Sequence, residues 1–228
     1  MMRKQAGFTL IEIAIVLVII GLLLGGVLKG QELITSARVR NLISQQDGVK
    51  AAYFGFLDRY RALPGDYALA TTNIANVTAN GNSNGQIELT AAACTAPCQP
   101  QESIAVWEHL SRAGFVTGSY VWAATETPAS VPTNPYARFI EVVFDTAYGT
   151  GTPAARHNIK TGNQIPSDIL AEIDRKVDDG NPNSGVFQFS TYAGGAGTAP
   201  TVATCTAAGP PVAWILPAAP NCGGASLL

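Results

Sequence analysis

The chain has 228 residues, of which 47% are hydrophobic and only 13% are charged, and its formal net charge is −2. Soluble domains carry roughly 25% charged residues, and disordered chains combine low hydrophobicity with high net charge, so this composition argues against a disordered chain. The 14 Lys and Arg residues do not exceed the 16 Asp and Glu residues, which argues against a nucleic-acid-binding protein.

The hydrophobic residues are concentrated at the N-terminus. Phe8–Leu28 is a run of 21 residues in which Glu12 is the only charge. As an α-helix this run spans about 30 Å, the thickness of the hydrocarbon core of a bilayer. A cleaved secretory signal peptide has a shorter apolar core and a small-residue cleavage site after it, whereas this run continues into Lys29 and helical sequence. We therefore predict one membrane-spanning helix. An ordinary anchor does not explain Glu12, because a charge there costs about 2.5–3.5 kcal/mol.

A short motif stands at the head of this run. Residues 4–12 read KQAGFTLIE, a basic leader followed by Gly, Phe and TLIE. The segment resembles the class III signal of type IV prepilins and type II secretion pseudopilins. The resemblance implies that residues 1–7 are a leader peptide, that a prepilin peptidase cuts between Gly7 and Phe8, and that Phe8 is then N-methylated.

The same resemblance implies a role for Glu12 in subunit assembly. In this family the carboxylate is thought to neutralise the N-terminal ammonium of a neighbouring subunit in the filament. A buried ion is tolerated only when it is paired, and cleavage creates a positive charge at Phe8. The alternative is that Glu12 caps the positive end of its own helix. The sequence leaves both interpretations open.

Beyond the span of residues 8–28, an amphipathic half of the same helix is predicted over residues 29–63. Its apolar stripe consists of Val39, Leu42, Val49, Tyr53, Phe56, Tyr60 and Leu63. Pro64 and the following Gly-Asp then end the helix. Residues 64–228 form the globular head, on whose sheet the stripe should pack. The resemblance implies the same α+β, type IV pilin-like fold: a long N-terminal helix on a small antiparallel β-sheet, with short helices and long loops.

Residues 64–103 read as a long loop region rich in Asn and Gly. One stretch mimics the first half of the calcium loop D-x-[DN]-x-[DN]-G, with Asn80, Asn82, Asn84 and Gly85. The twelfth position is Ala91 rather than Glu, so Ca²⁺ binding would need a remote carboxylate such as Glu88 or Glu102. The other interpretation is an Asn/Gly turn, in which these residues tolerate left-handed backbone.

Further elements of the head are predicted from local patterns. Helices are expected at 103–113 and 167–177, and strands at 115–122, 138–145, 185–192 and 212–216. His109, in the first of these helices, and His157, in a polar loop, lack a nearby Cys or His and should be solvated or hydrogen-bonded. Asp174, Asp178 and Asp179 either hold a cation, since positions i and i+4 share a helix face, or form a charged helix end.

The head carries all four cysteines. These are Cys94, Cys98, Cys205 and Cys222. An even number outside the cytoplasm implies disulfides, and of the three possible pairings we favour Cys94–Cys98 and Cys205–Cys222. The second would staple the Pro/Gly-rich tail, as the C-terminal disulfide loop does in many pilins. A zinc site is disfavoured because the Cys94-xxx-Cys98 spacing is looser than C-x₂-C and no His flanks either pair.

The resemblance implies a structural subunit of a type IV pilus or pilus-like filament rather than an enzyme. Its partners would be other pilins in a homo- or hetero-oligomeric filament, the prepilin peptidase and methyltransferase, and the inner-membrane assembly platform. The chain would begin as a single-pass inner-membrane protein with a periplasmic head and end in a pilus or periplasmic pseudopilus. The alternatives are a type II secretion pseudopilin and a membrane-anchored binding protein that never polymerises. No G-x-S-x-G, H-E-x-x-H or P-loop motif suggests catalysis.

Overall fold

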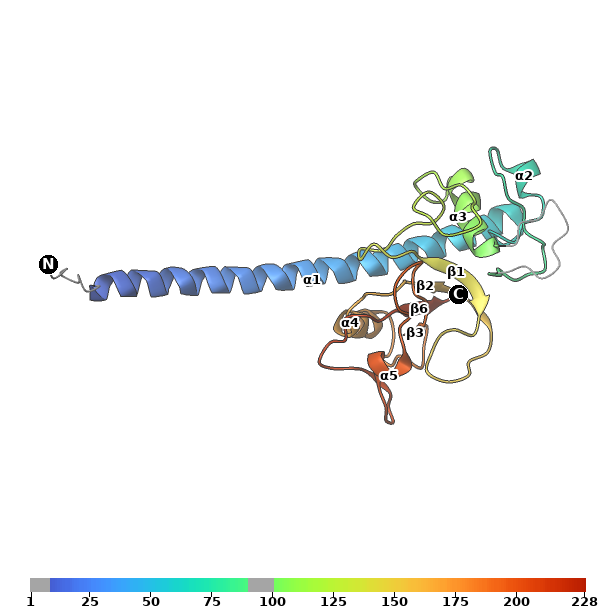
Figure 1. Cartoon of the computed structure of the whole chain (residues 1–228). Helices are drawn as coiled ribbons and strands as arrows, with labels where there is room; N and C mark the ends of the chain where they lie inside the picture. Colours follow the sequence, from blue (N-terminus) through green and yellow to red (C-terminus); the bar gives the residue numbers. More distant parts are fainter. Residues whose placement is uncertain (1–8, 90–100) are drawn as a thin grey trace. The chain divides into compact units, whose positions relative to one another are not determined.

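A computed structural model describes residues 9–89 and 101–228 (Figure 1). The predictions made for Gly7, Phe8, Cys94 and Cys98 lie outside these described residues. The chain divides into two compact units, Met1–Arg38 and Val39–Leu228. Each unit is described by itself below.

The first unit contains the N-terminal part of helix α1 (Leu10–Tyr60). Its large apolar side chains from Leu10 to Leu28 are all exposed. Among the described residues, α1 is the one helix long and apolar enough to cross a membrane, and none of its most apolar stretch is buried within the protein. This agrees with the predicted membrane helix, because so large an apolar surface is stable only against lipid or against other apolar helices.

The second unit begins with the remainder of α1, whose apolar stripe is buried as the sequence predicts. Val39, Leu42 and Phe56 are at most 1% exposed. Tyr60 and Leu63 are partly buried against the same core. The helix ends at Tyr60, three residues before the predicted end, because the chain turns at Arg61, where φ is +53°.

A four-stranded antiparallel sheet forms the centre of the head (Figure 1). Its strands, in spatial order, are β1 (Glu141–Asp145), β2 (Arg156–Lys160), β6 (Gly224–Leu227) and β3 (Phe187–Phe189). The C-terminal strand β6 therefore lies between β2 and β3. A second, two-stranded sheet consists of β4 (Thr206–Ala207) and β5 (Ala213–Trp214). This α+β layout confirms the predicted fold class and is consistent with the pilin fold.

The two faces of the larger sheet differ in character, because successive side chains of a strand point to opposite faces. Val142 and Ile159 belong to a hydrophobic core that includes Phe56 of α1 and Trp107 of α3 (Glu102–Arg112). On the opposite face of the sheet, Glu141 of β1 is the pairing partner of Lys160 of β2. The sheet thus has an apolar face toward α1 and a polar face away from it.

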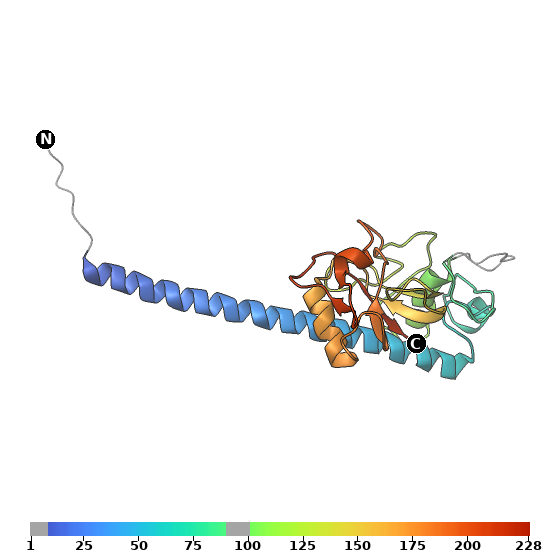
Figure 2. The ribbon, with the colours of Figure 1, turned by 90° about the horizontal axis from the view of Figure 1, so that it is seen from below.

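A second core cluster joins the first residues of the second unit to its C-terminal half. Val39 and Leu42 of α1 pack with Leu170 of α4 (Ser167–Val177), with Phe187 of β3 and with the C-terminal cysteines. Figure 2 shows α4 and the sheet along this part of α1. Helix α4 has the bounds that the sequence predicts, since its apolar residues recur with helical spacing from Ile169 onward.

Several predicted elements differ from the structure. The strand expected at 115–122 is absent: these residues form turns and irregular backbone, and Phe115, Tyr120 and Trp122 pack on the core as isolated side chains. Strands β2 and β6 are not predicted, because RHNIK and GASL are poor in β-branched and aromatic residues. The short helices α2 (Ala70–Asn73) and α5 (Val202–Cys205) are also missed.

Candidate functional site

Glu12 lies at the first turn of α1 and is bonded to Thr9. The Thr9 backbone N–H and the Thr9 hydroxyl both donate to Glu12 Oε2, each at 2.7 Å. In return the Glu12 N–H donates to Thr9 Oγ1 at 3.3 Å. Helix α1 begins at Leu10, so Thr9 is its N-cap and Glu12 its third residue. The pair is a capping box, in which two backbone donors at the helix start are satisfied reciprocally.

The TLIE motif therefore caps the N-terminal end of α1, independently of any role in assembly. The four residues T-L-I-E carry the S/T-x-x-E signature of a helix start followed by an apolar run. Both Thr9 donors use the same carboxylate oxygen, Oε2. Glu12 therefore caps its own helix, which is one of the two interpretations that the sequence leaves open.

Backbone N–H groups of the Asn/Gly loop are hydrogen-bonded to carboxylates from other segments of the chain. Asp66 Oδ1 accepts the Asn84 N–H at 3.0 Å, and Asp66 Oδ2 accepts the Gly85 N–H at 2.8 Å. Glu102 Oε1 accepts the Asn82 N–H at 2.8 Å, and Glu102 Oε2 accepts the Glu88 N–H at 3.2 Å. Asp66 thus fixes the turn to the segment that follows α1, and Glu102 fixes it to the start of α3.

The three candidate calcium ligands face different partners. The amide of Asn80 exchanges hydrogen bonds with Thr71 at 2.8 and 3.0 Å. The Nδ2 groups of Asn82 and Asn84 both donate to Glu88 Oε2, at 3.3 and 3.0 Å. The structure therefore brings Asn82 and Asn84 together with Glu88 but directs Asn80 elsewhere. Calcium binding at this loop stays a prediction.

Burial raises the pKa of two carboxyl groups around this loop. The pKa of Glu102 is raised to about 7 by desolvation, with added repulsion from Asp66 and Glu88. The pKa of Asp66 is also raised by desolvation, although three backbone hydrogen bonds oppose the shift. Desolvation disfavours the charged form of a carboxyl group, so of the two acids that fasten the loop Glu102 has a pKa near neutrality.

His109 is buried in the head and belongs to the same region. Its Nδ1 accepts the Gly65 N–H at 2.9 Å, and its Nε2 lies 2.9 Å from the Ala79 carbonyl oxygen. The ring is stacked near Phe56, with 6.1 Å between centroids. These partners define a neutral ring that donates from Nε2, and desolvation lowers its pKa. Of the two predicted states, solvated or hydrogen-bonded, His109 has the second, because it is buried in the core and hydrogen-bonded there.

The acidic end of α4 forms a compact group. Ligand atoms of Asp174, Asp178 and Asp179 all lie within 4.8 Å of one another. Each carboxylate is engaged by protein donors: Asp174 by the Trp214 indole N–H at 2.7 Å, Asp178 by the Phe187 N–H, and Asp179 by Ser184. Desolvation and the two neighbouring carboxylates raise the pKa of Asp174 to about 6. The group organises the chain that follows α4.

The disulfide between Cys205 and Cys222 is present, as favoured from the sequence, with the two Cα atoms 5.6 Å apart. Both residues are fully buried in the second core cluster. The bridge encloses β5 and the Pro-rich tail, so it fastens a segment with little regular structure of its own to the sheet.

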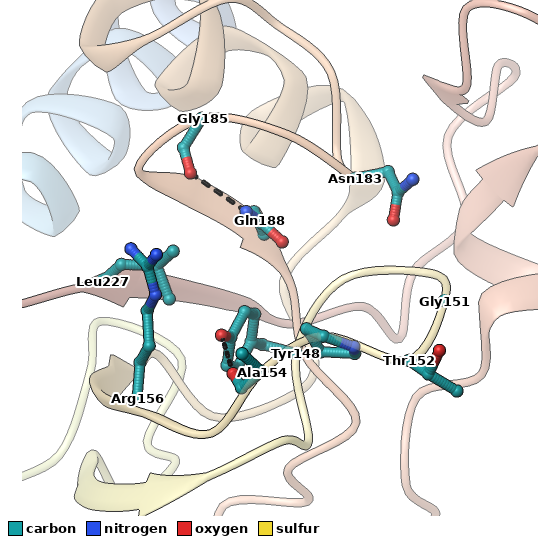
Figure 3. A pocket seen from close by; sticks show the side chains of 10 residues that line it. Tyr148, Gly151, Thr152, Ala154, Arg156, Asn183, Gly185, Gln188 and Leu227 are labelled. Carbon is teal, nitrogen blue, oxygen red and sulfur yellow. Dashed lines mark hydrogen bonds between the residues drawn. The ribbon is translucent and has the colours of Figure 1, made fainter.

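A polar cavity of about 460 Å³ lies at one end of the sheet (Figure 3). Among the described residues, Arg156 is the one charged residue in its lining. Other polar groups there hold the surrounding loops: the Tyr148 hydroxyl donates to the Ala154 carbonyl, and Gln188 Nε2 donates to the Gly185 carbonyl at 2.9 Å. Gly149 has a φ of +69°, and a Cβ there would approach Gln188 Oε1 to 2.8 Å. The cavity can accept a small polar or anionic group.

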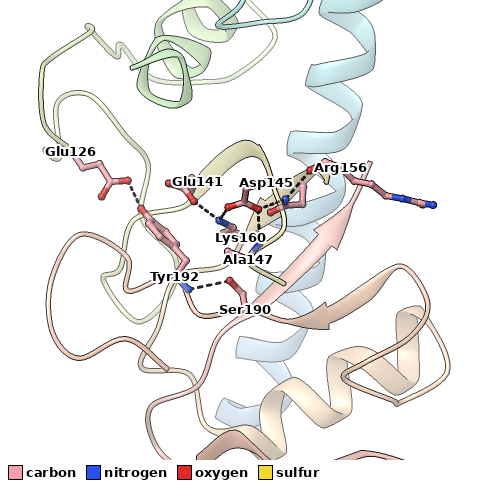
Figure 4. A network of polar contacts seen from close by, with 9 residues as sticks. Glu126, Glu141, Asp145, Ala147, Arg156, Lys160, Ser190 and Tyr192 are labelled. Atoms are coloured by element: carbon pink, nitrogen blue, oxygen red, sulfur yellow. Dashed lines mark hydrogen bonds and ion pairs between the residues drawn. The ribbon is translucent and has the colours of Figure 1, made fainter. Parts of the chain in front are cut away.

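The polar face of the sheet carries a charged network that the sequence does not reveal (Figure 4). Lys160 Nζ is paired with Glu141 Oε2 at 2.9 Å and with Asp145 Oδ2. Glu141 and Asp145 lie four residues apart on the same face of one predicted strand. This spacing is the one feature of the local sequence that points to the network. Lys160 lies in the unpredicted strand β2, so the cluster is visible only once the strands are paired.

One comparison with known proteins gives a match. The family model described as the prokaryotic N-terminal methylation motif matches residues 2–28. The matched residues include Gly7, Phe8 and Glu12, and they coincide with the segment on which the sequence resemblance rests. No curated protein and no solved structure matches the chain.

Proposed function

We propose that this chain, whose N-terminal segment carries the class III signal of type IV prepilins and pseudopilins, is a structural subunit of a type IV pilus or pilus-like filament. A prepilin peptidase would cut after Gly7, and the new N-terminus at Phe8 would be methylated. The subunit would then leave the inner membrane and polymerise through α1. Other pilins and the inner-membrane assembly platform are the proposed partners.

The observation that carries this proposal is the exposed apolar surface of α1, with one carboxylate at its start. Side chains such as Leu10, Leu17 and Leu22 are 92%, 64% and 74% exposed. Lipid covers such a surface in the membrane, and neighbouring α1 helices would cover it in a filament. The same surface therefore suits both environments in succession.

Glu12 has a defined place in this assembly. Its Oε2 is used by Thr9, and we propose that its Oε1 takes the N-terminal ammonium of a neighbouring subunit. A charged carboxylate in an apolar interior is strongly disfavoured unless paired. The capping box would hold the carboxylate in position before the neighbour arrives, which reduces the ordering cost of the intersubunit pair.

The head is proposed to face the periplasm before assembly and the filament surface afterwards. The Cys205–Cys222 disulfide fits a compartment outside the cytoplasm. A type II secretion pseudopilin shares the motif and the fold class, so the motif supports both systems equally. Purification of sheared surface fibres separates them, because a pilus subunit is abundant in the fibres.

Substitution of Glu12 tests the assembly step. Glu12→Ala is expected to abolish incorporation into sheared fibres while the chain still inserts in the inner membrane. Glu32→Ala is the matched control, because Glu32 is a carboxylate of the same helix whose partner, Lys29, is 68% exposed. The control should polymerise normally.

The outcomes separate the candidate functions. If Glu12→Ala enters fibres as the unchanged chain does, the proposed intersubunit role of Glu12 is wrong. If the unchanged chain is processed and inserted but never enters a filament, the protein is instead a membrane-anchored binding protein.

A further inference from the structure

The charged network on the polar face of the sheet has the composition of a reaction centre. Lys160 Nζ lies between the carboxylates of Glu141 and Asp145. The three side chains are 3%, 4% and 20% exposed, respectively. Figure 4 shows them converging from the adjacent strands β1 and β2. An amine, a carboxyl group in contact with it and a second buried carboxyl group are therefore held together away from bulk water.

The two oxygens of Asp145 have different surroundings. Its Oδ2 faces Lys160. Its Oδ1 accepts the Ala147 N–H at 3.1 Å and the Nδ2–H of Asn158 at 2.9 Å. Two N–H donors on one oxygen of a carboxyl group stabilise the negative charge that this oxygen would gain if a nucleophile attacked the carbon. The amine stands on the side of the other oxygen, which would leave.

Glu141 has the surroundings of a proton carrier. It contacts Lys160 directly, and burial raises its pKa although the Lys160 ammonium opposes the shift. A carboxyl group whose pKa lies closer to neutrality takes and returns protons more readily. The Tyr192 ring, whose centroid lies 5.8 Å from Lys160 Nζ, covers the amine. The Tyr192 hydroxyl is in turn bonded to Glu126.

We propose that Lys160 and Asp145 form an intramolecular amide bond between Lys160 Nζ and Asp145 Cγ, with Glu141 as the general acid–base. Within the ion pair the Lys160 ammonium gives one proton to Asp145 Oδ2, and the neutral amine attacks Asp145 Cγ. The tetrahedral oxygen is held by Ala147 and Asn158. The nitrogen gives its second proton to the Glu141 carboxylate, and Glu141 passes this proton to the departing Oδ2 hydroxyl and so returns to its charged form. The C–O bond breaks, the C–N bond remains, and one water is released without any oxidant or cofactor.

Proximity and burial favour this condensation. Well-oriented intramolecular groups react with effective molarities of about 10⁵–10⁸ M, which can offset the unfavourable equilibrium of amide formation in water. The bond also converts a poorly hydrated ion pair into a neutral amide, and so removes part of the desolvation cost of buried charges. A cleft of about 650 Å³, lined by Glu141, Asp145 and Lys160 among others, gives the released water a way out.

The cross-link would join β1 to β2 covalently, across the loop between Asp145 and Lys160. It does not depend on polymerisation, so it can hold whether or not the proposed filament function is correct. For a subunit exposed to tension, a covalent tie between neighbouring strands would resist separation of the sheet more strongly than hydrogen bonds do.

Peptide mass spectrometry tests the bond. The full chain is purified from membranes, reduced, alkylated and digested with trypsin. We expect one branched peptide in which residues 139–156 are joined to residues 157–175, lighter than the sum of its parts by one water and resistant to cleavage after Lys160. Separate peptides 157–160 and 161–175, with no branched product, would overturn the proposal.

Two variants locate the chemistry. Lys160→Arg keeps the positive charge and should show no loss of water, and Glu141→Gln should leave peptide 157–160 free. Near-ultraviolet circular dichroism shows whether each variant is folded, and the unchanged chain decides the existence of the bond in any case. A folded Glu141→Gln variant that is cross-linked as fully as the unchanged chain would refute the role of Glu141.

Discussion

The N-terminal unit and the head differ in how far apart in the sequence their interacting residues lie. In the N-terminal unit, Thr9 and Glu12 interact three positions apart, and the apolar residues beside them are exposed. In the head, the contacts that define each candidate site join residues far apart in sequence, such as Asp66 with Gly85 and Asp174 with Trp214. A short sequence motif can therefore identify the functional residues of the N-terminal unit. The sites in the head can be recognised only when the folded structure is known.

The largest expected effect contrasts two apolar residues of the same helix. Phe56→Ala should lower the free energy of unfolding of the head by about 3–5 kcal/mol, because Phe56 is fully buried in the core. Leu24→Ala should leave it unchanged, since Leu24 is 59% exposed in the other unit. Urea unfolding of the detergent-solubilised chain, followed by tryptophan fluorescence, measures both. Equal losses would contradict the division of α1 into an exposed and a buried part.

The C-terminal disulfide should have the next largest effect. Replacing both Cys205 and Cys222 by Ala should cost about 2–4 kcal/mol, because the bridge restricts the unfolded chain and both residues are buried in the core. The same urea titration measures the loss. Membrane insertion of the N-terminal unit is the control and should not change. A double variant as stable as the unchanged chain would show that the tail is held by packing alone.

The smallest effect is a pH dependence that belongs to the head. Burial lowers the pKa of His109 in the folded state below its ordinary value of 6.5. The folded head therefore binds this proton less readily than the unfolded chain does. Stability from the neutral ring is complete above about pH 6.5 and is lost as the pH falls toward the folded-state pKa. The His109 contribution to the free energy of unfolding should decline through this window.

Substitution isolates this contribution from the carboxyl groups. Glu102 and Asp174 have raised pKa values of about 7 and about 6, so their contributions change in the opposite sense and weaken as the pH rises. The comparison is therefore between the unchanged chain and His109→Gln, titrated in parallel. The variant should lose less stability on acidification, and identical pH profiles would contradict the buried neutral ring.

The parts of the molecule that the sequence predicts are those that depend on local pattern. Helical periodicity places the apolar stripe of α1, and the bounds of α4 are placed by Pro166 before it and by Asp178-Asp179-Gly180 after it. Strand β6 is not predicted because Gly224 and Ala225 are small residues with little strand preference. They occupy a strand that is packed tightly between its two neighbours, β2 and β3. Strand pairing, unlike helical periodicity, is settled by residues distant in sequence.

The candidate sites follow the same division. Glu12 is found from its motif, and the capping signature T-x-x-E is present in the sequence as well. Lys160 carries no local signal, because its partners lie on another strand and its own strand is unpredicted. Asp66 likewise gains its role only when Asn84 and Gly85 fold back onto it. Clusters of buried charged residues can be located only when the spatial arrangement of the strands and loops is known.

The N-terminus of the chain recovered from purified surface or periplasmic filaments tests the central claim most directly. Mass spectrometry of the fibre fraction should find a chain that begins at N-methylated Phe8, without residues 1–7. That result would join processing, methylation and assembly in one molecule. Filaments that lack the chain, or recovery only of an unprocessed membrane form that begins before Phe8, would contradict the proposal that this protein is a filament subunit.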